Sequence, residues 1–314
     1  MSRIVSLLPA ATEFVCALGA RDELVGVSHE CDEPASVATL PRLTRSAIGG
    51  AAGSRGIDEA VRATAARGLP LFELDAARLR ALAPDVVIAQ ELCEVCAVSL
   101  DDVRAALGDR IGRETALVAL APTRLDEVLA DARRIAEAIG RERECAALLD
   151  SLRGRIAEVG RRAVSAWERP RTVTVEWLDP VMLGGTWMPE LVEIAGGEPV
   201  GAAAGEKAPQ PTPLELEGLD AEAVVLKPCG LGLADALAEL AVARRTLPLG
   251  RWPALARGRV VVADGSRHFN RPGPRIVDSL ELLAAALHPD LFADFARRHA
   301  ADFRRVAADG SVVR

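Results

Sequence analysis

Two short segments of the chain carry the side chains best suited to bind a metal ion. Residues 28–32 read SHECD and supply His29 and Cys31, and residues 90–99 read QELCEVCAVS and supply Cys93 and Cys96. One imidazole and three thiolates are enough for a tetrahedral transition-metal site, with zinc or iron as the ion. The spacing therefore predicts a metal site formed by His-x-Cys and Cys-x-x-Cys together.

Carboxylates accompany these four residues and broaden the chemistry. An organic ligand could contact the same segments through polar side chains, and structural cysteines are a third interpretation. A carboxylate could also act as the general base of an enzyme that uses a corrinoid or thiol substrate. The acidic ligand-contact candidates are Glu30, Asp32 and Glu91, and the candidates for the general base are Glu30 and Glu91.

Both segments directly follow an expected buried strand, over residues 24–28 and 86–89. In parallel α/β sheets, ligands bind beyond the carboxyl ends of the strands. We therefore expect the two segments to emerge at the same ligand-binding edge. A redox pair is less favoured, because Ser99 and Asp102 resemble a helix cap and place the helix start after both cysteines.

The second half of the chain offers further ligand contacts after expected strands. Glu176 lies near the end of one strand, and Trp187 opens the next helix, where its indole could stack on a flat ligand. The segment Arg267-His268-Phe269-Asn270-Arg271 follows another strand and is the best anion- or ligand-contact segment in this half. The remaining histidines, His288 and His299, are expected to face solvent.

Strands and helices alternate along the chain, as is typical of α/β proteins with mostly parallel sheets. Short apolar runs predict strands over residues 3–7, 24–28, 86–89, 117–120, 172–177, 223–226 and 259–263.

Between the fourth and fifth strands, apolar residues recur every three or four positions, which predicts a connecting helix within residues 122–168. Gly140 could divide this segment into two helices. The expected organisation is an N-terminal α/β lobe over 1–121, the connecting helix, and a C-terminal α/β lobe over 169–314.

Composition excludes several classes of function. The net charge is −7 and only 3% of the residues are aromatic, with no block of Lys or Arg, so a nucleic-acid partner is not expected. No apolar run reaches 18 residues, so no membrane span is expected. The opening MSRIVSLLPAATE has too short an apolar stretch for a signal-peptide core, and we expect a cytoplasmic location.

Several segments resemble the helical-backbone solute-binding proteins, also called class III, which include cobalamin binders and iron-siderophore binders. The segments are RIVSLLPAATEFVCALGARDELVGVSHECDEP, LRALAPDVVIA, LVEIAGGEPV, LEGLDAEAVVL and SRHFNRPGPRIVDSLELLAAAL, in this order. The resemblance implies two α/β lobes with mostly parallel sheets, bridged by one long helix, with a ligand cleft between the lobes. It is closest to the cobalamin-binding branch.

The resemblance and the polar segments together predict a non-enzymatic protein that binds cobalamin or another metal chelate. Exported members hand their ligand to an ABC transporter, and without an export signal we do not expect that docking here. A zinc or iron ion bound by His29, Cys31, Cys93 and Cys96 is the first alternative, and an enzyme acting on a corrinoid or thiol substrate is the second.

Overall fold

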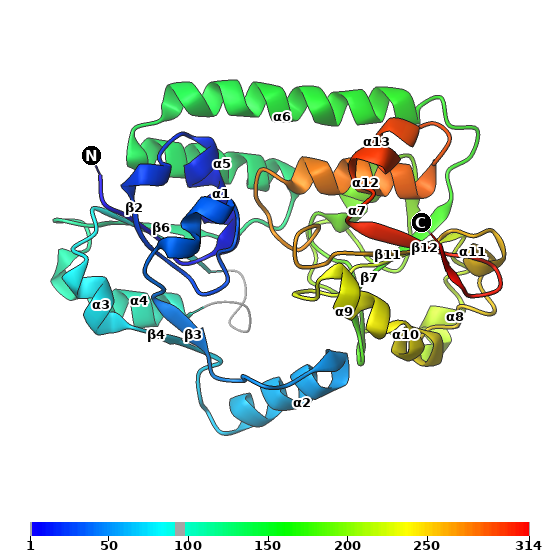
Figure 1. The fold of residues 1–314 in the computed structure, drawn as a ribbon, viewed down its shortest axis with the longest axis horizontal. Helices are drawn as coiled ribbons and strands as arrows, with labels where there is room; N and C mark the ends of the chain where they lie inside the picture. The colour runs from blue at the N-terminus through cyan, green and yellow to red at the C-terminus, as the bar shows by residue number, and fades with distance from the viewer. Residues whose placement is uncertain (1, 92–97, 314) are drawn as a thin grey trace. The chain divides into compact units, whose positions relative to one another are not determined.

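The chain folds into two compact units, each an α/β structure with its own main β-sheet (Figure 1). The computed structural model describes residues 2–91 and 98–313. Unit 1 consists of Met1–Ala51, Glu59–Pro122 and Asp126–Ser151, and unit 2 consists of Ala52–Asp58, Thr123–Leu125 and Leu152–Arg314. The two-lobe α/β fold with parallel sheets, predicted from the sequence, is confirmed.

Four parallel strands form the main sheet of unit 1, in the order β2-β1-β5-β6. They are β1 (Ile4–Ser6), β2 (Leu24–Val27), β5 (Val86–Gln90) and β6 (Ala116–Leu120). The central strands β1 and β5 are buried along almost their whole length, which explains their nearly continuous apolar sequence. A separate antiparallel pair is formed by β3 (Thr44–Ser46) and β4 (Phe72–Leu74).

Helices cover both faces of this sheet (Figure 1). The helices of the first part of the chain are α1 (Pro9–Ala17), α2 (Gly53–Ala66), α3 (Ala76–Ala81) and α4 (Leu100–Leu107). Side chains of α3 and α4 pack with those of β1 and β5 in one hydrophobic core. The predicted cap at the start of α4 is confirmed, because the Ser99 hydroxyl accepts a hydrogen bond from the Asp102 amide at 3.0 Å.

The connecting segment forms two helices, α5 (Leu125–Ile139) and α6 (Glu142–Ala163). Gly140 lies between them with φ at +66°, a left-handed conformation that costs glycine little and other residues more. Of the two arrangements that the sequence allowed, the structure therefore has the one divided at Gly140, and α6 is the longer helix, at 22 residues.

Unit 2 contains a mixed sheet in the order β13-β12-β11-β10-β7-β8, with β9 paired to β7. Its strands are β7 (Arg171–Leu178), β8 (Val181–Leu183), β9 (Glu198–Pro199), β10 (Ala223–Leu226), β11 (Val260–Ala263), β12 (Phe303–Val306) and β13 (Val312–Val313). The central strands β7, β10 and β11 are parallel, whereas β12 returns antiparallel to β11.

The helices of unit 2 are mostly short. They are α7 (Met188–Ile194), α8 (Pro213–Glu217), α9 (Leu233–Ala238), α10 (Leu240–Thr246), α11 (Pro253–Ala256), α12 (Ile276–Leu287) and α13 (Ala293–Arg298). Helix α12 is buried on nearly all sides. Over residues 2–91 and 98–313, none of the helices combines the length and the apolar character needed to cross a membrane.

Candidate ligand-binding site

The chain order of the unit 1 strands creates a natural place for a ligand. From β1 the chain moves to one neighbour, β2, and the strand on the other side, β5, is added later. In open parallel sheets, ligands bind outside the carboxyl ends of two neighbouring strands whose chain connections lead to opposite sides of the sheet. Here these two strands are β1 and β5.

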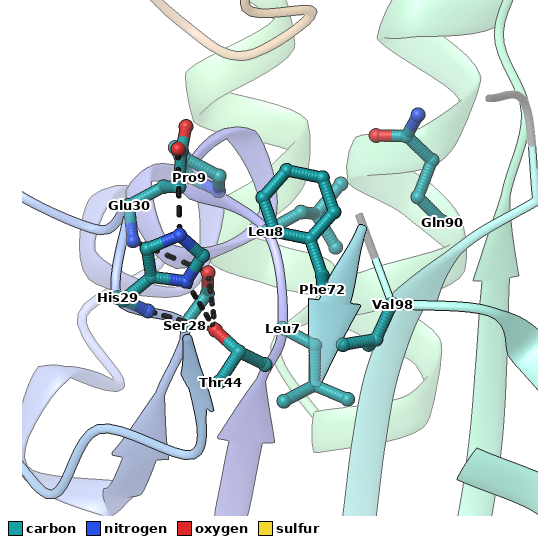
Figure 2. Close-up of a pocket in the computed structure, with 10 residues that line it drawn as sticks. All are labelled: Leu7, Leu8, Pro9, Ser28, His29, Glu30, Thr44, Phe72, Gln90 and Val98. Atoms are coloured by element: carbon teal, nitrogen blue, oxygen red, sulfur yellow. Dashed lines mark hydrogen bonds and ion pairs between the residues drawn. The ribbon is translucent and has the colours of Figure 1, made fainter. Parts of the chain in front are cut away.

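A pocket lies at these strand ends (Figure 2). It encloses about 290 Å³ of space, solvent included. Its apolar wall consists of Leu7, Leu8, Pro9, Phe72 and Val98, and its polar wall consists of Ser28, His29, Glu30, Thr44 and Gln90. An apolar surface with a few convergent polar groups is typical of a small-molecule site.

Both ring nitrogens of His29 lie near polar side chains of the pocket. Its Nδ1 lies 2.6 Å from the Thr44 hydroxyl, and that hydroxyl donates its own proton to Ser28 Oγ at 3.1 Å. With the Thr44 proton donated to Ser28, we assign Nδ1–H as the donor to Thr44, and the second nitrogen, Nε2, then carries the lone pair of a neutral ring. This Nε2 is buried without a hydrogen-bond partner.

The surroundings of the ring keep it neutral. Burial lowers the pKa of His29; the Glu30 carboxylate opposes this shift and the nearby Arg42 guanidinium adds to it. Glu30 Oε1 lies 3.6 Å from Nε2, and the Phe72 ring lies 5.5 Å from the imidazole ring. Figure 2 shows the imidazole between the Glu30 carboxylate and the Thr44 hydroxyl. A neutral imidazole with one nitrogen fixed by a second residue is the form that ligates metals.

The other predicted residues of the first lobe are more dispersed. Cys31 is fully buried, and its Sγ accepts a hydrogen bond from Thr12 Oγ1 at 3.1 Å, as expected of a thiol packed in the interior. Asp32 and Glu91 are exposed, and Glu91 donates its amide to Leu120 at the end of β6. Cys93 and Cys96 lie outside the described residues. Of the four proposed metal ligands, the structure describes only His29 and Cys31, so the His-x-Cys and Cys-x-x-Cys metal site stays a prediction.

Unit 2 presents a second set of polar groups at the carboxyl ends of its parallel strands. Lys227, directly after β10, is fully buried, and its ammonium contacts Glu176 Oε2 at 3.1 Å and Asn270 Oδ1 at 2.7 Å. Glu176 was predicted as a ligand contact, and the structure places it in this ion pair, one quarter exposed. The lysine therefore fixes the orientation of the Glu176 carboxylate.

Trp187 occupies a different environment from the one predicted. Its side chain is only 5% exposed, and its indole N–H donates to the Phe269 carbonyl at 2.8 Å. The indole therefore packs inside unit 2 and holds the segment after β11, instead of presenting a face for stacking.

The basic segment after β11 divides into surface and interior residues. Arg267 is about half exposed and lies 3.4 Å from Asp302, and Arg271 lies 3.5 Å from Ser266 Oγ. His268 is buried, at 4% exposure. The prediction that His288 and His299 face solvent is wrong, because both are at most 8% exposed.

Sequence reasoning missed four residues that shape these sites: Thr44, Phe72, Gln90 and Lys227. Lys227 had a usable signal, because a lysine directly after a fully apolar strand is either buried at the strand end or in a ligand site. Thr44 and Phe72 had none, since they come from β3 and β4, two short strands without an apolar run.

Comparisons with known proteins agree with this architecture. Among solved structures, a periplasmic haem-binding protein from Pseudomonas aeruginosa superposes with a TM-score of 0.68 at 21% identity, covering 92% of this chain and 93% of that one. The periplasmic vitamin B12-binding protein BtuF of Vibrio cholerae superposes with a TM-score of 0.64 at 19% identity, covering 91% of this chain and 96% of that one. S. aureus IsdE, solved with haem, gives 0.66 at 13% identity, covering 92% and 99%. At these identities the likeness is one of fold.

The sequence itself supplies the assignment to a family. Curated protein sequences include no match to this chain. The profile of the periplasmic binding protein family, in contrast, matches residues 4–266, which is most of the chain. The chain belongs to the periplasmic binding protein family.

Proposed function

We propose that this protein is a non-enzymatic binding protein for a metal chelate of the cobalamin or haem type, and that the unit 1 pocket contacts the chelate. The observation that carries the proposal is His29 Nε2, a neutral, buried nitrogen without a hydrogen-bond partner in a pocket at the ligand edge of the sheet. Structures of similar fold include binders of haem and of vitamin B12, which supports this class of ligand.

In this proposal, the apolar wall of the pocket contacts the macrocycle and the polar wall contacts its metal. The Phe72 ring and the leucines before α1 contact the apolar surface of the macrocycle, and burying such surface stabilises the complex by roughly 25 cal/mol per Å². His29 Nε2 binds the metal of the chelate. Its partner Glu30 has a half-exposed side chain, so a rotation of Glu30 into solvent opens Nε2 to the ligand.

Equilibrium dialysis with hydroxocobalamin, haemin, metal-free protoporphyrin and zinc chloride tests the proposal. We expect one of the two metal chelates to bind at one equivalent with micromolar or better affinity, and the metal-free macrocycle to bind at least tenfold more weakly. Failure of both chelates to bind at high protein concentration would refute the proposal.

A pair of variants tests whether the pocket is the site. Phe72→Ala removes the aromatic wall and should weaken chelate binding about tenfold or more, which corresponds to about 1.4 kcal/mol or more. Leu69→Ala, in the same unit but 46% exposed and outside the pocket, is the matched control and should bind like the wild type. Equal affinities of the two variants, both folded by circular dichroism, would place the ligand elsewhere.

A further inference from the structure

Three side chains with metal-binding atoms lie close together in unit 2. None of them belongs to the unit 1 pocket. They are His268 in the segment after β11, His299 at the end of α13, and Asp302 just before β12. One ligand atom from each lies within 4.8 Å of the other two, and they are the one such group in the parts of the chain that the structure describes. Backbone pairing holds the segments together, because the Asp264 amide donates to the Asp302 carbonyl.

The separations between the ligand atoms suit a tetrahedral ion. Zinc–nitrogen bonds of about 2.0–2.1 Å at tetrahedral angles place neighbouring ligand atoms roughly 3.3 Å apart. His268 Nε2 lies 3.5 Å from Asp302 Oδ2, and His299 Nδ1 lies 3.9 Å from the same oxygen. Asp302 Oδ2 therefore lies close to tetrahedral ligand spacing from both imidazoles, and the two ring nitrogens, which lie within 4.8 Å of each other, would move closer together around a bound ion.

His299 is already oriented as a metal ligand. Its Nε2 lies 3.1 Å from Glu281 Oε2, and Glu281 is 2% exposed and also contacts Arg155 and Arg298. Arg298 donates to Glu281 Oε2, and Arg155 donates to the other oxygen, Oε1, at 2.9 Å. An ionised carboxylate that accepts from Nε2–H leaves the lone pair of Nδ1 directed at Asp302, and such a carboxylate–histidine pair is the usual support of a zinc-bound imidazole.

His268 supplies a second and independent observation. The side chain is 4% exposed, and both of its ring nitrogens are buried without a hydrogen-bond partner. Leaving a buried polar atom without a partner costs about 1–3 kcal/mol. A cation bound between His268 and Asp302 would satisfy one nitrogen and neutralise the carboxylate beside it.

We propose that His268, His299 and Asp302 bind a divalent transition-metal ion, with zinc the ion that these ligands suit best. Two imidazoles and one carboxylate leave the fourth tetrahedral position to water or to a further ligand. The ion joins the end of β11, the end of α13 and the start of β12. This site goes beyond the proposed function, because it uses no side chain of the unit 1 pocket.

Zinc binding to a Cys93→Ser/Cys96→Ser variant tests the proposal without interference from those two thiols. After chelator treatment and dialysis, we expect the variant to take up one equivalent of zinc. The X-ray absorption spectrum should show only nitrogen and oxygen at about 2.0–2.1 Å. No zinc uptake, or sulfur neighbours at about 2.3 Å, would overturn the proposal.

Substitutions in the same background identify the ligands. His268→Gln and Asp302→Asn should each lower zinc affinity at least 100-fold, whereas His288→Gln should leave it unchanged. His288 is a matched control, since it is a buried histidine of unit 2 whose Nε2 pairs with the Gly196 carbonyl. Full zinc affinity in folded His268→Gln would overturn the proposal. If a substitution prevents folding, the X-ray absorption spectrum of the Cys93→Ser/Cys96→Ser protein still shows whether the zinc ligands are nitrogen and oxygen or include sulfur.

Discussion

At the scale of single residues, two histidines are each held by one ring nitrogen and present the other. His29 donates from Nδ1 to Thr44, and His299 is paired through Nε2 with Glu281. The supporting residue fixes the tautomer, so it decides which nitrogen can reach a metal. The sequence showed His29 as a candidate but not its partner, because Thr44 lies 15 residues away on a strand with no apolar pattern.

Asp131 in α5 is a buried carboxylate whose ionisation opposes folding. Burial raises its pKa to about 6, against the opposing effect of Arg134, and its side chain is 2% exposed. The folded state therefore binds the proton more tightly than the unfolded chain. The resulting stabilisation is complete below the unfolded pKa of about 4 and is lost as the pH rises through about 6.

Asp131→Asn should consequently raise the free energy of unfolding at pH 7.5 by about 2–3 kcal/mol, at 1.36 kcal/mol per pKa unit. The gain should vanish below about pH 4, where the wild-type side chain is protonated in both states. Urea unfolding across this pH range measures the difference. Asp150→Asn, an exposed position in α6, is the control and should change stability by less than about 0.5 kcal/mol. A pH-independent effect of Asp131→Asn would contradict this account.

At the scale of helices and strands, the sequence predicted the elements that have a regular apolar pattern. All seven expected strands are present, from β1 to β11, because buried parallel strands need continuous apolar residues. The strands that were missed, such as β3 and β12, are short and carry polar or charged side chains. The start of α4 followed from the cap residues Ser99 and Asp102, whereas periodicity alone could not decide whether α5 and α6 were one helix.

Replacing either of two glycines in this helical segment by alanine should change the free energy of unfolding, but with opposite sign. Gly140 has φ at +66° and open space where a Cβ would lie, so Gly140→Ala adds only backbone strain and should lower the free energy of unfolding by about 1–2 kcal/mol. Gly154 lies inside α6 and also has open space where a Cβ would lie. Gly154→Ala should therefore raise the free energy of unfolding by about 0.5–1 kcal/mol. Chemical denaturation of both variants measures the two effects, and an equal sign for both would refute this explanation of the helix break.

At the scale of the whole molecule, the order of the segments carried more information than any single motif. The resemblance over nearly the whole chain predicted two α/β lobes, which both the fold and the family assignment confirm. The ligand contacts were less predictable, because they depend on side-chain partners from distant segments, such as Lys227 with Asn270. Trp187 illustrates the difficulty: its position at a helix start suited a ligand contact, but its indole N–H is bonded inside unit 2. The cytoplasmic location stays a prediction.

The central claim is that His29 Nε2 binds the metal of a chelate in the unit 1 pocket, and the visible absorption spectrum of the bound chelate tests it most directly. Titration of the wild-type protein with hydroxocobalamin or haemin should shift the absorption bands to those of an imidazole-ligated metal, complete at one equivalent. His29→Gln should abolish that shift and weaken binding at least tenfold, whereas Leu69→Ala should preserve both. An unshifted spectrum of the wild-type protein, or the same shift in His29→Gln, would contradict the claim.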